Sequence, residues 1–237
     1  MKQQGNKTYT WTIRKIIPEA PFVYSLILEA QGERPSFISG QYLTVQLPGF
    51  EPAEGKSYSI SSERDEPCIR LTIKEMGPFS KALCAKSIGD TLTTSAPYGF
   101  FYPEIEDAHD LVFIAGGIGI TPCLSIIKTL IKNSYPNTIF LFYSNRTLSD
   151  CIFKNELDAL QKECKHLTIT YHFTREPSSI ERDTFGRIEG ASICTAIPQP
   201  TNSDFFVCGS IDFTKTMWNE LRNAGIQSTQ IYTEGYF

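Results

Sequence analysis

Up to about Pro103, apolar and polar residues alternate in short runs, and prolines and glycines separate these runs. β-Branched and aromatic side chains are frequent in the runs, which favours strands. We therefore expect one helix, from Phe79 to about Lys86, and short strands at residues 8–16, 22–28, 40–47, 56–61, 68–74 and 91–95. Several short strands at this spacing are typical of a small antiparallel barrel.

After Asp110 the pattern changes to alternating strands and helices. We expect strands at 111–115, 138–144, 167–173, 204–208 and 230–233, and helices at 121–132, 148–164 and 212–224. Such alternation predicts a parallel sheet with helices on both faces, and ligands bind at the carboxyl ends of its strands. The predicted fold is therefore an N-terminal antiparallel β-barrel domain, residues 1–105, followed by an α/β parallel-sheet domain, residues 106–237.

Composition narrows the class of protein. The chain has 237 residues and a formal net charge of −4. Lys and Arg nearly balance Asp and Glu up to Pro103, at 11 against 10, but are outnumbered 11 to 16 after it. The acidic second half argues against nucleic acid as a partner.

The sequence also lacks the common targeting and metal-binding signals. It has no apolar run long enough to span a bilayer and no signal-peptide core, so we expect a cytoplasmic protein without a membrane partner. The seven cysteines include no C-x-x-C pair, so we expect no metal site, and scattered thiols suit a reducing compartment.

A glycine-rich turn, Ala115–Pro122, directly follows the apolar run Leu111–Ile114. Thr121 is expected to cap the following helix, with Pro122 at its first position. Glycines allow close backbone approach, and a helix N-terminus offers N–H groups, so this turn suits a phosphate. The turn differs from the G-x-G-x-x-G fingerprint because Pro122 replaces the third glycine. A turn that only packs closely against its neighbours remains the alternative.

The segment Lys56-Ser57-Tyr58-Ser59-Ile60-Ser61-Ser62 resembles the R-x-Y-S-x-x-S element of the ferredoxin–NADP reductase superfamily. Other landmarks of that superfamily follow in the same order along nearly the whole chain. They are Gly77–Leu83, Gly89–Leu92, Pro97–Phe100, Gly117–Pro122, Val207–Ser210 and Tyr232–Phe237. By this resemblance the chain is identified as a flavin-binding barrel followed by a nucleotide-binding domain.

The resemblance implies flavin-binding residues in the first half. Tyr58 would stack on the flavin ring, and Ser59 would lie near the flavin N5 atom. The loop formed by Gly77, Pro78, Phe79 and Ser80 would hold a diphosphate, which favours FAD over FMN, and Ser80 could also cap the helix there. Further cofactor-binding candidates are Lys56, which replaces the usual arginine and keeps its charge without the planar fork, and Thr72 and Lys74.

The resemblance implies nucleotide-binding and catalytic residues in the second half. Cys208, with Gly209 beside it, would lie next to the reactive carbon of the nicotinamide, and Glu234 would assist proton movement. Ser59, Cys208 and Glu234 are thus the catalytic candidates. Nucleotide-binding candidates in the glycine turn are Gly117, Gly119, Thr121 and Pro122, and either Tyr236 or Phe237 would cover the flavin.

The choice between NADH and NADPH stays open in the sequence. Arg146 and Arg175 follow two predicted strands, where arginines suit a 2′-phosphate, whereas exposed loop arginines need no such role. The acidic charge of this half favours NADH.

The implied function is an FAD-containing reductase. It would transfer a hydride from NAD(P)H to FAD and pass electrons to a separate acceptor, such as a ferredoxin or an oxygenase component. No C-x4-C-x2-C stretch for a plant-type iron–sulfur cluster is present. The alternatives are an NAD(P)H:flavin or ferric reductase, which the lysine at position 56 favours, and a non-catalytic flavin-binding subunit that senses redox state.

Overall fold

A computed structural model describes residues 7–104, 109–176 and 184–236. The chain divides into two compact units, Met1–Tyr102 and Pro103–Phe237.

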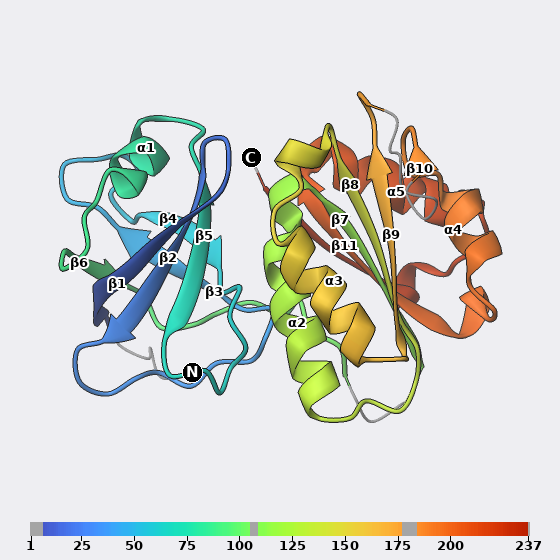
Figure 1. Cartoon of the computed structure of the whole chain (residues 1–237), viewed down its shortest axis with the longest axis horizontal. Helices are drawn as coiled ribbons and strands as arrows, with labels where there is room; N and C mark the ends of the chain where they lie inside the picture. The colour runs from blue at the N-terminus through green and yellow to red at the C-terminus, as the bar shows by residue number, and fades with distance from the viewer. Residues whose placement is uncertain (1–6, 105–108, 177–183, 237) are drawn as a thin grey trace. The chain divides into compact units, whose positions relative to one another are not determined.

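The first unit is an antiparallel β-structure whose strands lie in the order β4-β3-β6-β1-β2-β5 (Figure 1). Its elements are β1 (Tyr9–Ala20), β2 (Val23–Ala30), β3 (Tyr42–Gln46), β4 (Lys56–Ser59), β5 (Ile69–Lys74), α1 (Pro78–Cys84) and β6 (Thr91–Thr94). An antiparallel bridge between Ile60 and Leu71 joins the end of β4 to β5, the two outermost strands of this order. The sheet therefore closes on itself, and the expected barrel is confirmed.

The barrel interior contains one apolar cluster. Trp11, Leu26, Leu71 and Phe79 are all buried in it, with Phe79 coming from α1. The indole nitrogen of Trp11 donates a hydrogen bond to the Thr94 hydroxyl at 2.9 Å, which satisfies a polar atom that would otherwise be costly to bury.

The second unit is a parallel sheet in the order β10-β9-β8-β7-β11-β12. Its strands are β7 (Asp110–Gly116), β8 (Ile139–Asn145), β9 (Leu167–Phe173), β10 (Thr184–Phe185), β11 (Ser203–Ser210) and β12 (Ile231–Tyr236). Helices α2 (Ile120–Lys132) and α3 (Lys154–Glu163) cover one face, and α4 (Gly190–Ala196) and α5 (Ile211–Asn223) cover the other (Figure 1). The expected three-layer α/β architecture is confirmed.

Short 3-10 turns complete the second unit. They are η1 (Gly117–Gly119), η2 (Leu148–Asp150), η3 (Pro200–Asn202) and η4 (Ser228–Gln230). In the part of the chain that the structure describes, no helix is both long and apolar enough to cross a membrane.

The predicted helix at 148–164 was wrong in its first part. The chain forms η2 and then starts α3 only at Lys154, because Phe153 adopts a left-handed backbone with φ of 61°. A right-handed helix cannot continue through that conformation. The prediction also missed β10, which has only two residues, and α4, a seven-residue helix that begins at a glycine.

The start of α2 also differs from the prediction. Gly119, not Thr121, is the N-cap, and the helix begins at Ile120. The Thr121 hydroxyl instead donates to the Ile118 carbonyl at 3.0 Å, and Pro122 occupies the third helical position. Proline is tolerated there because the first N–H groups of a helix have no intrahelical acceptor.

Two glycines of this turn serve different purposes. A Cβ on Gly119 would lie 2.2 Å from the Cys208 carbonyl oxygen, so only glycine lets the turn approach the end of β11. Gly117 has φ of 54°, a left-handed conformation that favours glycine, and a Cβ at that position would meet nothing within 4 Å. Glycine is therefore favoured there by the backbone conformation and not by lack of space. Close packing thus explains Gly119 but not Gly117.

We expect Gly119→Ala to destabilise the second unit far more than Gly117→Ala. The first substitution forces a Cβ into backbone atoms and should cost about 3 kcal/mol or more, whereas the second adds only left-handed strain of about 1 kcal/mol. Urea unfolding followed by circular dichroism measures both variants against the wild type. Equal losses of stability in the two variants would contradict this account.

Candidate functional site

The carboxyl ends of β7, β11 and β12 bring the main candidates of the second unit together. In the strand register Cys208 lies between Ala115 of β7 and Glu234 of β12. Phe205 and Val207 pack in the cluster that includes residues of α4 and α5, so alternation along the strand turns Cys208 toward α2. The η1 turn approaches this point through Gly119.

The Phe213 ring of α5 fixes the other side of this strand end. A Cβ on Gly116 would lie 3.0 Å from the ring, and one on Gly209 would lie 2.6 Å from it. Gly209, a predicted nucleotide-binding residue, is therefore needed for packing. The backbone ends of β7 and β11 are held close together by this aromatic contact.

Cys208 is a protonated thiol at neutral pH. Burial raises its pKa well above the ordinary value, and the nearby Cys123 and Glu234 raise it further. A hydrogen bond with the Tyr236 side chain acts in the opposite direction but is a smaller effect. Because a neutral thiol is a poor nucleophile, Cys208 suits positioning and exclusion of water, not covalent attack.

Cys123, a residue of α2 that was not predicted to be part of the site, lies close to Cys208 and Glu234. Its thiol donates a hydrogen bond to the Gly119 carbonyl at 3.5 Å from within α2. Burial, and then the nearby Glu234, raises its pKa above the ordinary value. Cys123 thus connects the glycine turn to the surroundings of Cys208 and Glu234.

Glu234 is suited to exchange a proton near neutral pH. Burial raises the pKa of its carboxyl from 4.5 to about 7. Its Oε2 atom is buried and has no hydrogen-bond partner among the described residues. A buried carboxyl with an unused oxygen at a ligand-binding strand edge is typical of a functional acid or base. Phe237, the alternative aromatic candidate to Tyr236, lies outside the described residues.

The flavin candidates of the first unit lie on β4 and at the start of α1. The Lys56 ammonium lies 5.9 Å from the centre of the Phe79 ring, which places a cation beside the first turn of α1. Tyr58 is half-buried against the barrel core, and burial, followed by the nearby Cys84, raises its pKa. Ser59 is almost fully buried.

Ser80 caps α1, but from inside the helix. Gly77 is the N-cap, Pro78 begins the helix one residue earlier than expected, and Ser80 is the third helical residue. Its hydroxyl oxygen accepts hydrogen bonds from the backbone N–H groups of Met76 at 2.8 Å and Gly77 at 3.1 Å, and it donates to the Gly77 carbonyl at 3.1 Å. The hydroxyl is therefore already bonded within the loop.

Thr72 and Lys74 share β5 but differ in their surroundings. The Thr72 hydroxyl is buried and hydrogen-bonded to Ser25 and Ser61, at 2.8 and 2.9 Å, whereas Lys74 is exposed at the end of the strand.

The structure brings Arg146 and Arg175 together after β8 and β9. The backbone N–H of Arg175 donates to the Arg146 carbonyl at 2.9 Å, and both residues are exposed. The Glu176 carboxylate accepts a hydrogen bond from the backbone N–H of Leu148 beside them. Sequence reasoning missed this carboxylate, because only the pairing of β8 with β9 brings it there.

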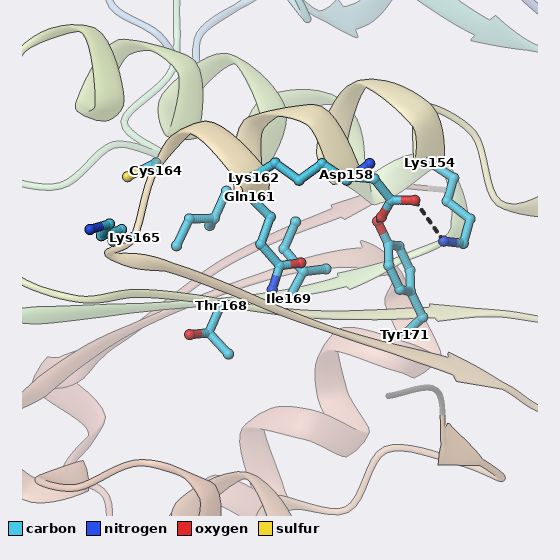
Figure 2. A pocket seen from close by; sticks show the side chains of 10 residues that line it. Lys154, Asp158, Gln161, Lys162, Cys164, Lys165, Thr168, Ile169 and Tyr171 are labelled. Carbon is cyan, nitrogen blue, oxygen red and sulfur yellow. Dashed lines mark hydrogen bonds and ion pairs between the residues drawn. The ribbon is translucent and has the colours of Figure 1, made fainter. Parts of the chain in front are cut away.

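A groove of about 500 Å³ lies elsewhere on this unit, between α3 and β9 (Figure 2). There the Lys154 ammonium bonds Asp158 at 2.8 Å and lies 4.3 Å from the centre of the Tyr171 ring, and the Tyr171 hydroxyl bonds Asp158 at 2.7 Å. None of the predicted site residues lines this groove. Within the described residues, no cluster of three or more His, Cys, Asp or Glu could hold a metal ion.

Known proteins share sequence and fold with this chain. The sequence model of the oxidoreductase NAD-binding domain family matches residues 113–218. A flavohemoprotein of Bacillus cereus is 28% identical over 250 residues, which cover 98% of this chain and 62% of that protein. The chain thus spans about three fifths of the length of the curated relatives it matches.

Solved structures share the fold of the whole chain. The flavohem-like FAD/NAD-binding domain of a nitric oxide dioxygenase from Vibrio cholerae has a TM-score of 0.85 and 23% identity, with 96% of this chain and 98% of that chain covered. A ferredoxin–NADP+ reductase from Neisseria gonorrhoeae has a TM-score of 0.81 and 22% identity, with coverages of 98% and 99%.

The two units together have the fold of the FAD/NAD-binding part of these proteins. The expected resemblance to the ferredoxin–NADP reductase superfamily thus holds for the fold of the whole chain, and the sequence match to an oxidoreductase NAD-binding domain covers residues 113–218.

Substituting Glu234 should change how stability depends on pH. A carboxyl whose pKa is about 7 when folded and 4.5 when unfolded stabilises the fold fully below about pH 4.5, and this contribution is lost as the pH rises through 7. Relative to Glu234→Gln, the wild type should therefore lose up to about 3 kcal/mol of unfolding free energy between pH 4.5 and 8. Denaturant unfolding at several pH values measures this difference. The exposed Glu163→Gln is the control, and a wild type that keeps a constant offset from Glu234→Gln would contradict the assignment.

Proposed function

We propose that this chain transfers a hydride from NAD(P)H to FAD and passes the electrons singly to a separate acceptor. The observation that supports this best is the group formed by the buried Cys208 and the half-buried Glu234 and Tyr236 at the strand ends beside the glycine turn. A neutral thiol and a carboxyl with a pKa near 7 suit a site that positions the nicotinamide and flavin rings and takes up or releases one proton.

The first unit fits FAD in its distribution of charge and aromatic surface. Lys56 and the first turn of α1 provide positive potential for a diphosphate, and Tyr58 offers a ring for stacking. Because the Ser80 hydroxyl is already bonded to the loop backbone, we assign it to shaping the loop, with the lysine and helix terminus holding the anion. Bound FAD would supply the ring that accepts the hydride.

The chain's own residues would then have distinct tasks. The Gly117 turn, open on its outer side, would hold the nucleotide phosphates at the start of α2. Cys208 would exclude water beside the nicotinamide, Ser59 would contact the flavin near N5, and Glu234 would hold or release a proton.

For the nucleotide we propose NADH. The second half of the chain is acidic, and the Glu176 carboxylate lies beside Arg146 and Arg175, where a 2′-phosphate would have to bind. A carboxylate near that position favours a ribose hydroxyl over a phosphate.

For the acceptor we propose a one-electron carrier protein, such as a ferredoxin or an oxygenase component. Names of matched relatives join a flavin to a heme, and solved structures with the same fold include a ferredoxin reductase in carbazole 1,9a-dioxygenase. We also propose a cytoplasmic location, in keeping with seven cysteines that form no disulfide. The lysine at position 56 supports a second function, an NAD(P)H:flavin or ferric reductase, because a lysine lacks the bidentate grip of the usual arginine on phosphate.

The first experiment is an absorbance spectrum of the purified protein, followed by anaerobic addition of NADH and then NADPH. We expect a bound-flavin spectrum that bleaches rapidly with NADH. Protein purified without flavin that turns over added flavin would favour the second function. Failure to bind flavin or oxidise either nucleotide would exclude both.

Cys208→Ala should slow flavin reduction at least about tenfold without changing flavin content. Removing the thiol leaves a gap beside the reacting carbon, and small misplacements of reacting atoms have large effects on rate. Stopped-flow reduction by NADH measures the rate, and the flavin absorbance of the purified protein is the internal control. Equal rates in variant and wild type would remove Cys208 from the site.

A further inference from the structure

A chain of hydrogen-bonded side chains runs across one side of the barrel. The Ser25 hydroxyl on β2 bonds Glu19 Oε1 at 2.6 Å and the Thr72 hydroxyl at 2.8 Å. Thr72 in turn bonds the Ser61 hydroxyl at 2.9 Å, and Ser61 donates to the Arg70 carbonyl at 3.1 Å. The three hydroxyl residues are almost completely buried, so these bonds exchange little with water.

The strand register places this chain on the same face as Ser59. Ser25 is directly opposite Thr72 in the β2–β5 pair. The antiparallel bridge between Ile60 and Leu71 places Ser59 across from Thr72 and Ser61 across from Arg70. Because opposite residues share a face and residues two apart in a strand do as well, the hydroxyls of the chain line the face that includes Ser59.

The same chain ties the segment Ser59–Ser62 to β5. The Ser61 backbone N–H donates to the Arg70 carbonyl at 2.8 Å, the Arg70 backbone N–H donates to the Ser62 hydroxyl at 3.0 Å, and the Arg70 guanidinium donates to the Ser61 carbonyl at 3.1 Å. The segment is therefore held by backbone bonds, and its orientation is completed by the buried hydroxyls.

Glu19 is the outer end of the chain, where its Oε1 atom accepts a hydrogen bond from the Ser25 hydroxyl. At the other end, the Ser61 hydroxyl donates to the Arg70 carbonyl. A side-chain amide at position 19 would keep an oxygen that accepts from Ser25, whereas an alanine would remove the outer partner of Ser25.

We propose that Glu19, Ser25, Thr72 and Ser61 act together as positioning residues that orient the Ser59–Ser62 segment against the flavin ring. This inference rests on the proposed function, because it requires FAD to bind at β4. It changes the expectation for Thr72, which the sequence suggested as a direct cofactor contact: its hydroxyl is used by Ser25 and Ser61. Thr72 acts on the flavin through Ser61.

The test compares two buried threonines of the same barrel. Thr72→Val breaks the chain, whereas Thr94→Val removes a buried hydroxyl bonded to Trp11, outside the chain. Both variants should lose stability, but only Thr72→Val should weaken FAD binding, by about tenfold, and shift the flavin midpoint potential. Fluorescence titration with FAD and anaerobic redox titration of the flavin-loaded protein measure these two quantities. Ser25→Ala breaks the chain at another point and replaces Thr72→Val if that variant does not fold.

Two substitutions of Glu19 test whether the bond between position 19 and Ser25 matters for FAD binding. Glu19→Gln should keep FAD affinity and potential close to the wild type, while Glu19→Ala should weaken binding several-fold. If Thr72→Val, Thr94→Val and the wild type have the same FAD affinity and the same flavin potential, the network is purely structural. That result would overturn this inference and leave the proposed function standing. A wild type that fails to bind FAD would overturn the proposed function, and this inference with it.

Discussion

The backbone contact between the glycine turn and the end of β11 determines most of the second unit's site. Gly119 lies against the Cys208 carbonyl so closely that no side chain fits, and Cys123 bonds the Gly119 carbonyl from the helix side. The start of α2 is thus fixed relative to Cys208. Since β12 pairs with β11 in register, Glu234 is fixed relative to the same point. One steric constraint therefore sets the positions of the turn, the thiol and the carboxyl.

Burial then decides what these groups can do chemically. It raises the pKa of the Cys208 and Cys123 thiols, which stay neutral, and raises the pKa of the Glu234 carboxyl to about 7, so that this carboxyl is about half protonated near neutral pH. In the barrel, buried hydroxyls satisfy one another instead of bonding water. In the barrel, the polar groups near the predicted cofactor face are thus held by the protein before any ligand arrives, which reduces the reorganisation that binding requires.

The order of strands and helices was predictable because hydrophobic periodicity is a local property. The short alternating runs up to Pro103 predicted the barrel, and the alternating strands and helices after Asp110 predicted the parallel sheet. Family motifs indicated Cys208 and Glu234. Helix starts were less predictable: Gly119 and Gly77 are the N-caps, and the left-handed Phe153 separates η2 from α3. Those features depend on tertiary packing. The contact of Cys208 with Glu234 and the bonding of Thr72 depend on strand register, which a single sequence does not specify.

The order of the strands in the second sheet has a consequence for how the protein folds. β7 pairs on one side with β8, which follows it closely, but on the other with β11, where Asp110 meets Ser203 about ninety residues later. Until that late strand arrives, β7 has an open edge that other chains could join. Cys208 is on β11, the strand that closes this edge, and Glu234 is on β12, which pairs with β11 in turn. A molecule able to bind nucleotide is therefore one that has passed its most aggregation-prone stage, so ligand binding doubles as a sign of complete folding.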